Sequence, residues 1–171
     1  MKDGHSLPRN PEVVLVLNSG GSFVEYEFFR MAKEQRRLAK GIVDHIGQKD
    51  AYLMYERYDG REIKEKAPIK SVEDALAMII EFCTNPSHGV LESASQLDAI
   101  GHRVVHGGEK FRESTRITGD VKRSIAECAT LAPLHNPANM KGIEVCEKLF
   151  PGVPNVAVFD TAFHHSMPPS S

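Results

Sequence analysis

The stretch from Val13 to Phe29 reads VVLVLNSGGSFVEYEFF, and its pattern decides the class of fold. Val13 to Leu17 is a continuous apolar run, which is typical of a strand buried in a sheet. Asn18 to Ser22 ends that run with turn-forming residues, and Phe23 to Phe29 resumes a strand-like pattern. The stretch therefore predicts a hairpin of two strands, joined by a glycine-rich loop whose backbone is open to a ligand.

Strand-like segments continue beyond this hairpin. They are predicted over Leu38 to Ile46, Ala51 to Tyr58 and Glu62 to Ala67, and a turn at Asp59-Gly60 joins the last two. The charged stretch from Lys33 to Lys40 is interpreted as a solvated turn or an exposed strand edge, in preference to a binding patch. The first part of the chain is therefore predicted to be mostly sheet.

The rest of the chain alternates between helix and strand patterns. Apolar residues recur at helical spacing from Ser71 to about Thr84, from Thr118 to Leu131, and from Asn136 until just before Pro151. Strands are predicted over Leu97 to Val105 and Val156 to Phe159. Strands followed by alternating helices and strands predict an α/β fold, in which helices flank a mixed β-sheet.

Composition limits the class of protein. The 171 residues suit one domain, and they are 41% hydrophobic and 26% charged. A net charge of −2 gives no electrostatic argument for binding nucleic acid or an acidic membrane, and no stretch is apolar enough to span a bilayer. Three widely spaced cysteines without a CxxC pair favour a cytoplasmic compartment. Residues 1–12 are predicted to be a flexible tail before a domain over residues 13–171.

Polar groups are predicted to gather where the central strands end. Ligands of such sheets bind beyond the carboxyl ends of the strands, where Asn18, Arg103 to Gly108 and Asp160 all fall. The Arg103 guanidinium either holds a carboxylate or phosphate through two parallel hydrogen bonds or pairs with a structural carboxylate. Asp160 follows four apolar residues, so it is either a catalytic carboxylate at the rim of the sheet or a helix cap.

Other polar side chains also have both a binding and a structural interpretation. The His135 imidazole either donates to a developing negative charge or hydrogen-bonds its own loop. The Asn18 amide either approaches a phosphate or a hydrated metal or stabilises its turn. His102 and His106 are four residues apart, but their segment is predicted to be strand and turn, so a zinc site is not favoured.

Four motifs make the chain similar to a known family. They are VLVLNSGGS at Val14 to Ser22, IGHRVVHGGEKF at Ile100 to Phe111, LAPLHNPAN at Leu131 to Asn139, and VAVFDTAFHHSMP at Val156 to Pro168. In order and in approximate spacing these motifs resemble those of acetate kinases, and propionate kinases are the nearest relatives that share them. The resemblance implies an actin-like ATPase fold built from ribonuclease-H-like domains.

The resemblance also implies a reaction and its acceptor-side residues. Acetate kinases transfer the γ-phosphoryl group of ATP to acetate, reversibly, with Mg²⁺. In this sequence Asp160 would be the catalytic carboxylate, Arg103 would bind the carboxylate or the phosphoryl group in transfer, and His135 would be a supporting donor. Val105 and Leu134 would line the pocket for the acetate methyl group.

On the nucleotide side the sequence departs from the family pattern. Asn18, with Ser22, would lie beside the magnesium ion and the phosphates. The family turn reads N-x-G-S-S-S followed by an aliphatic residue and lysine, whereas here Gly21 and Phe23 replace two serines and Glu25 stands at the lysine position. A unit-charge interaction at about 4 Å contributes about 1 to 4 kcal/mol, so Glu25 is expected to weaken nucleotide binding if it faces ATP.

The chain ends at Ser171, where acetate kinases continue through a second domain. The resemblance therefore implies that these residues hold half of an active site and alone turn over little acetate, and that full-length members are homodimers. The alternatives are a propionate kinase, or a degenerate, non-catalytic acetate-kinase-like domain that binds a partner or small anion. A metal-dependent hydrolase using His102, His106 and Asp160 is the least favoured.

Overall fold

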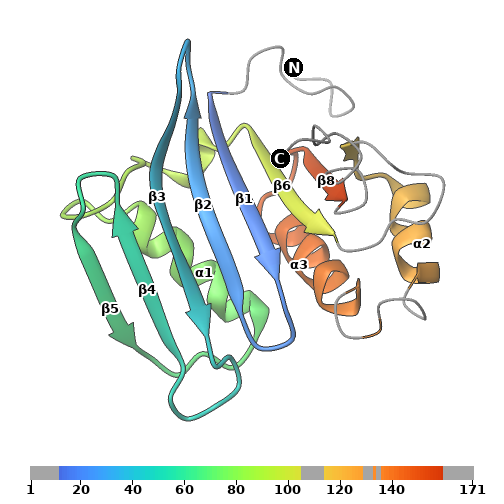
Figure 1. Cartoon of the computed structure of the whole chain (residues 1–171), viewed down its shortest axis with the longest axis horizontal. Coiled ribbons are helices and arrows are strands. Elements are labelled where there is room, and N and C mark those ends of the chain that lie inside the picture. The colour runs from blue at the N-terminus through green and yellow to red at the C-terminus, as the bar shows by residue number, and fades with distance from the viewer. Residues whose placement is uncertain (1–11, 105–113, 129–132, 134–135, 160–171) are drawn as a thin grey trace, which may run out of the picture.

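In the part of the chain that the structure describes, eight strands form one sheet and three α-helices accompany it (Figure 1). The computed structural model describes residues 12–104, 114–128, 133 and 136–159. The strands lie in the order β5-β4-β3-β2-β1-β6-β8-β7. They are β1 (Val13–Ser19), β2 (Val24–Met31), β3 (Gln35–Asp44), β4 (Tyr52–Arg57), β5 (Glu62–Lys66), β6 (Ala99–Val104), β7 (Thr115–Arg116) and β8 (Asn155–Phe159). The helices are α1 (Val72–Cys83), α2 (Gly119–Glu127) and α3 (Asn136–Leu149), and a short 3₁₀ turn spans Ala94–Gln96.

The central hairpin is β1 and β2, as the sequence predicts. The two strands pair antiparallel, with Asn18 opposite Glu25 and Ser19 opposite Val24. On its other side β1 runs parallel to β6, and β6 runs parallel to β8. The carboxyl ends of β1, β6 and β8 therefore meet at one edge of the sheet, the lower edge in Figure 1.

Two helices cover one face of the sheet. α1 contacts β2, β3 and β4, whereas α3 contacts β1, β6 and β8. The two helices lie next to each other behind the sheet in Figure 1, and α2 packs against α3. Alternate residues of β1, namely Val13, Leu15 and Leu17, are buried in this core. The apolar run that opens the chain's first motif is therefore a central strand, as predicted.

The Tyr26 side chain crosses β3 at Gly41 and reaches β4. Its hydroxyl donates to the Met54 carbonyl oxygen at 2.8 Å. A Cβ at Gly41 would lie 2.6 Å from the Cζ atom of Tyr26, so this close approach requires glycine. Burial raises the pKa of the Tyr26 hydroxyl above its ordinary value, which keeps it protonated and able to donate.

The predicted elements are present, with shifted ends. Residues 32–34 form a bend and β3 already begins at Gln35, so the charged stretch is a solvated turn followed by exposed strand residues. β6 begins at Ala99 because Leu97 closes the preceding 3₁₀ turn. The predicted extension of α2 to Leu131 falls on residues 129–131, outside the described part of the chain. The two-residue strand β7 was not predicted.

The three cysteines, Cys83, Cys128 and Cys146, are all buried and free. Burial raises the pKa of the Cys83 and Cys146 thiols to about 12, so both stay protonated and unreactive near neutral pH. All three cysteines therefore serve as small apolar residues of the core. Across the described ranges, none of the helices is long and apolar enough to cross a membrane.

Candidate active site

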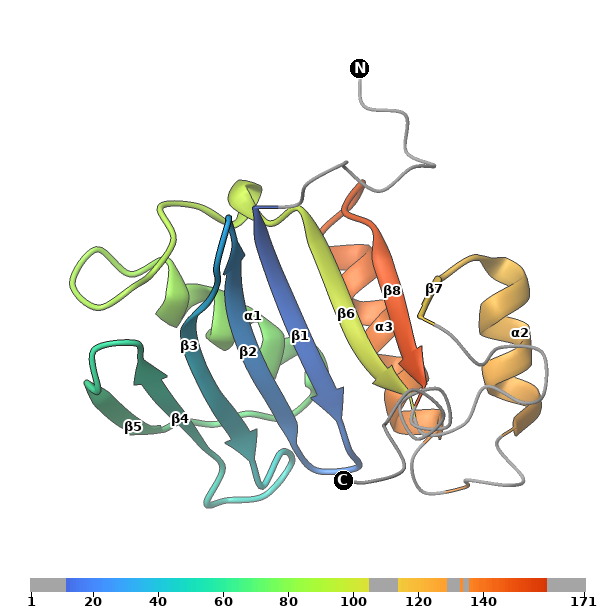
Figure 2. The same cartoon turned by 45° about the horizontal axis from the view of Figure 1, so that its top comes forward.

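Asn18 and Arg103 occupy equivalent places at the ends of adjacent parallel strands. Leu17 pairs with His102, and both side chains are buried on the helix-covered face. The next residues, Asn18 and Arg103, therefore lie on the opposite face of the sheet. Asn18 is half-buried, and Arg103 is the exposed residue of an otherwise buried β6. The ends of β1 and β6 that carry these two residues lie side by side at one edge of the sheet (Figure 2).

The turn after β1 is fixed by two backbone hydrogen bonds, which leave several of its N–H groups available to a ligand. The Gly20 N–H donates to the Phe23 carbonyl at 2.9 Å, and the Ile46 N–H donates to the Ser22 carbonyl at 2.9 Å. The Phe23 ring lies over Gly20 and fills the space that a side chain would take there. Within the described residues, the N–H groups of Gly21, Ser22 and Phe23 donate to no acceptor. Successive free backbone N–H groups of this kind suit an anion such as a phosphate.

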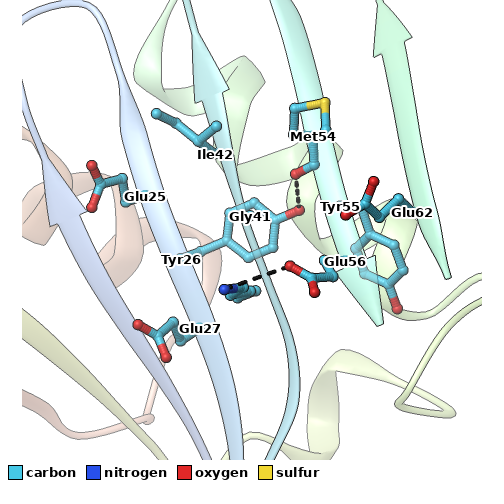
Figure 3. A pocket seen from close by; sticks show the side chains of 10 residues that line it. Glu25, Tyr26, Glu27, Gly41, Ile42, Met54, Tyr55, Glu56 and Glu62 are labelled. Atoms are coloured by element: carbon cyan, nitrogen blue, oxygen red, sulfur yellow. Dashed lines mark hydrogen bonds and ion pairs between the residues drawn. The ribbon is translucent and has the colours of Figure 1, made fainter. Parts of the chain in front are cut away.

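Glu25 stands directly opposite Asn18 on β2 and faces the same side of the sheet. It also borders a hollow of 330 Å³ on that open face (Figure 3). Glu27 and Glu62 line the same hollow, and Lys40 pairs there with Glu56 at 3.5 Å. The surface next to Asn18 is therefore acidic, which is unfavourable for a nucleotide phosphate.

The first turn of α3 lies against the end of β1. The Asn139 side-chain amide donates to the Ser19 carbonyl at 2.8 Å. The Asn136 side-chain amide donates to the Ile125 carbonyl near the end of α2 at 3.0 Å. The amino-terminal end of α3, where the helix dipole favours negative charge, is thereby fixed beside the glycine-rich turn. The sequence interpretation missed Asn139; its only signal was a second asparagine at helical spacing from Asn136.

His102 is not available at the surface beside Arg103. Its Nε2 lies 2.7 Å from the Asn155 Oδ1, and the side chain is 2% exposed. Burial lowers the pKa of His102 to about 4, so the imidazole is neutral at physiological pH. No cluster of three or more metal-ligating side chains occurs within the described ranges. His106 and Asp160, the other members of the disfavoured metal site, lie outside those ranges.

Acidification is expected to destabilise the chain through His102. Its pKa is about 6.5 when unfolded and about 4 when folded, so the unfolded state binds the proton more tightly. The contribution of the neutral His102 to the free energy of unfolding is therefore fully present above pH 6.5 and is lost as the pH falls towards 4. It amounts to about 3 kcal/mol in the free energy of unfolding. Urea unfolding at pH 7.5 and 4.5 should show a smaller pH dependence for His102→Gln than for the wild-type chain; equal dependence would contradict this assignment.

The described residues include only part of the predicted site. Asn18, Ser22, Glu25 and Arg103 are described: Asn18 and Arg103 lie where β1 and β6 end, Ser22 lies in the turn after β1, and Glu25 lies opposite Asn18 on β2. The other predicted residues, Val105, Leu134, His135 and Asp160, lie outside the described part of the chain.

Comparison with known proteins places this chain in a family. The acetokinase family matches residues 13–171. The chain belongs to the acetokinase family. An acetate kinase of Caldicellulosiruptor saccharolyticus is 49% identical over 155 residues, which are 91% of this chain and 38% of that protein. An acetate kinase of Methanosarcina mazei is 44% identical over 156 residues, again 91% of this chain and 38% of the relative.

Solved structures of acetokinase relatives have the same fold. The crystal structure of Porphyromonas gingivalis acetate kinase has a TM-score of 0.85 and 41% identity, over 93% of this chain and 40% of that one. A propionate kinase from Francisella tularensis has a TM-score of 0.78 and 36% identity, over 93% and 39% of the two chains. The predicted mixed sheet of the actin-like class is thereby confirmed. This acetokinase-family chain spans about 38% of the length of the curated relatives, and it corresponds to an amino-terminal portion of them.

Proposed function

We propose that this chain supplies the phosphate-contacting turn and the acceptor-binding arginine of an acetate kinase. The complete site transfers the γ-phosphoryl group of ATP to acetate and gives acetyl phosphate and ADP. One observation carries the proposal: Asn18 and Arg103 lie on the same face of adjacent parallel strands, beside a turn with three N–H groups that donate to no acceptor among the described residues. The 49% identity to an acetate kinase supports the choice of reaction.

Arg103 has the chemistry that the acceptor side needs. Phosphoryl transfer depends on alignment and on neutralising charge, with little covalent help from the protein. A planar guanidinium binds a carboxylate or a phosphoryl group through two parallel hydrogen bonds and fixes its orientation. Since Arg103 is exposed at the end of β6, it can reach a ligand at this edge of the sheet. It would hold acetate in line with the nucleotide and stabilise the phosphoryl group in transfer.

Four further residues are assigned to the proposed site because of their positions in the sequence. Asp160, the catalytic carboxylate of the proposal, directly follows Phe159, the last residue of β8. His135, as a supporting donor, directly precedes Asn136, the first residue of α3. Val105 follows the end of β6, and with Leu134 it would form the pocket for the acetate methyl group.

The turn offers oxygen ligands that fit Mg²⁺. The Asn18 amide oxygen and the Ser22 hydroxyl are hard oxygen donors at the two ends of the turn segment. Asn18 would be the principal residue on the metal side. When bound, Mg²⁺ would neutralise part of the phosphate charge. The amides of the turn would hold the phosphates, and ATP would be the co-substrate.

Glu25→Lys is expected to raise the affinity of the chain for inorganic pyrophosphate by about five-fold at low salt, and less at high salt. The change replaces an exposed anion opposite Asn18 by a cation. Isothermal titration calorimetry gives the affinity. Glu27→Lys is the matched control, because Glu27 faces the same side of β2 two residues farther from the turn. Equal gains in both variants would mean that position 25 does not face the phosphates.

Two related functions compete with this proposal. The likeness to the Francisella tularensis propionate kinase favours propionate as an alternative acceptor. Glu25 beside the turn, together with Gly21 and Phe23, favours a degenerate domain that binds an anion or a partner without catalysis. We propose further that the protein works in the cytoplasm and that its full-length relatives are homodimers.

A chimaeric enzyme would separate these functions. Residues 13–171 would replace the aligned segment of the Caldicellulosiruptor saccharolyticus acetate kinase, and hydroxylamine would trap the acyl phosphate formed from ATP. We expect more product from acetate than from propionate, and none after Arg103→Ala. The reverse order would favour propionate kinase. A folded chimaera without activity on either acid, even after Glu25→Lys, would favour the degenerate domain and overturn the proposal.

The chain assayed alone should form little acetyl phosphate, because it spans about 38% of the length of its relatives. Robust turnover would contradict the proposal that it supplies only one side of the site.

A further inference from the structure

The first turn of α3 carries two buried asparagines at positions i and i+3. Asn136 is 1% exposed and Asn139 is 3% exposed. Each donates its side-chain amide to a backbone carbonyl of another element: Asn136 to Ile125 at 3.0 Å and Asn139 to Ser19 at 2.8 Å. Residues three apart lie on one face of a helix. This face of α3 is therefore bonded to the region where α2 ends and, separately, to the end of β1.

The carbonyl that Asn139 binds belongs to the peptide that opens the glycine-rich turn. That Ser19–Gly20 peptide follows Asn18 directly, and its N–H donates to the Phe23 carbonyl at 2.9 Å. Both polar groups of this peptide are thus held, the carbonyl by Asn139 and the N–H by the turn itself. The following N–H groups, of Gly21, Ser22 and Phe23, donate to nothing within the described residues. The orientation of the fixed peptide sets the direction in which the rest of the turn leaves β1.

Gly142, three residues after Asn139, lets α3 come this close. A Cβ on Gly142 would lie 2.5 Å from the Ser19 Oγ and 3.1 Å from the Ser19 Cβ. The Ser19 side chain is 3% exposed, and its hydroxyl has no hydrogen-bond partner within the described residues. Glycine is a poor residue for a helix interior, so this contact gives it a structural reason. The Ser19 hydroxyl fills the space beside the bare helix backbone.

We propose that Asn139 is a positioning residue for the phosphate-contacting turn. Its bond to the Ser19 carbonyl, together with the close contact at Gly142, presets the turn so that its free N–H groups are ordered before a phosphate arrives. This inference rests on the proposed function for its ligand. The ordering of the turn itself is independent of that function, because the bond from Asn139 to the Ser19 carbonyl should order the turn in the free chain as well.

Asn136 provides a matched control. It is the same residue type in the same turn of the same helix, equally buried, and it makes the same kind of bond, but to the Ile125 carbonyl. If Asn139 served only to attach α3 to the sheet, Asn139→Ala and Asn136→Ala would both lower stability. The two variants would then affect the backbone amides of Gly20 to Phe23 to the same extent. If Asn139 positions the turn, only its replacement should alter those amides.

The first measurement uses the free ¹⁵N-labelled chain. We expect Asn139→Ala to shift the amide resonances of Gly20 to Phe23 and to raise their hydrogen-exchange rates by about ten-fold relative to the wild type, while Asn136→Ala leaves them unchanged. Asn139→Leu keeps the approximate size and branching of the side chain but has no donor, so it should behave as Asn139→Ala and serves if the alanine variant does not fold. Unchanged turn amides in the Asn139 variant that folds, or equal changes in Asn136→Ala, would overturn the inference.

A second pair of variants tests the contact at Gly142. Gly142→Ala should push α3 away from Ser19 and reproduce the shifts of Asn139→Ala. Adding Ser19→Ala removes the Oγ that is 2.5 Å from the new methyl group and should move the turn amides back towards the wild type. Turn amides that stay unchanged in Gly142→Ala, or show no recovery in the double variant, would contradict the role given to this contact.

The ligand measurement adds inorganic pyrophosphate to the same samples. We expect Asn139→Ala to weaken binding at the turn by about ten-fold and Asn136→Ala by less than about two-fold. If the wild type binds pyrophosphate at the turn and Asn139→Ala binds it with the same affinity, the positioning role is refuted. Absence of any pyrophosphate-induced shift at the wild-type turn would instead count against the proposed function, and the free-chain measurement would still decide the inference.

Discussion

Arg103→Ala is expected to lower the affinity of the chain for acetyl phosphate by about 100-fold, the largest functional effect among the predicted variants. Two charge-assisted hydrogen bonds to the ligand would be lost, and at the low end of their usual range, about 1.5 kcal/mol each, they contribute about 3 kcal/mol together. A loss of 100-fold corresponds to about 2.8 kcal/mol. Isothermal titration calorimetry with acetyl phosphate measures the affinity directly.

Arg103→Lys tests whether the fork of the guanidinium matters beyond its charge. Lysine keeps one positive charge but cannot make two parallel hydrogen bonds, so we expect most of the loss to remain. Arg37→Ala is the control, because Arg37 is an exposed arginine near the start of β3, where it pairs with Glu27 at 3.8 Å. Equal losses in Arg37→Ala and Arg103→Ala would show that acetyl phosphate responds to overall charge and not to a site at the end of β6.

Gly41→Ala is expected to be the most destabilising single change in the sheet. The added Cβ would lie 2.6 Å from the Tyr26 Cζ and even nearer to the Tyr26 hydroxyl and the Met54 carbonyl oxygen. The carbonyl belongs to the backbone of β4 and cannot rotate away, so β3 and β4 must separate or Tyr26 must leave its buried place. We expect a loss of at least about 3 kcal/mol in the free energy of unfolding, measured by urea denaturation.

Gly21→Ala is the control for this prediction. Nothing lies within 4 Å of the position where its Cβ would be, so the substitution should leave the free energy of unfolding within about 0.5 kcal/mol of the wild type. A Gly41→Ala variant as stable as Gly21→Ala would mean that Tyr26 does not cross β3 as described.

The fold could be predicted because its decisive signals are local. The apolar run of Val13 to Leu17 and the glycine-rich turn after it indicate a central strand and a hairpin without any knowledge of the rest of the chain. β7 was missed because two residues carry no periodicity. The start of β3 at Gln35 was missed because its exposed, charged side chains lie outside the apolar pattern from which strands are recognised.

The candidate site could be predicted only in part. Asn18 and Arg103 could be proposed as ligand-binding residues because each stands at or near the end of a predicted strand. The role of Asn139 could not be found in this way, because its partner Ser19 lies 120 residues away and only folding brings them together. The difference between His102 and Arg103 depends on which face of β6 each residue occupies. One step along the strand separates a buried neutral imidazole from an exposed guanidinium.

The most direct test of the central claim is a titration of the ¹⁵N-labelled chain with acetyl phosphate, followed by two-dimensional NMR. We expect saturable shifts that are confined to the Asn18 side-chain amide, the Arg103 Nε–H and the backbone amides of the turn from Gly20 to Phe23. Shifts that instead gather around the acidic hollow near Met54 and Glu56, or no saturable shift at Arg103, would contradict it.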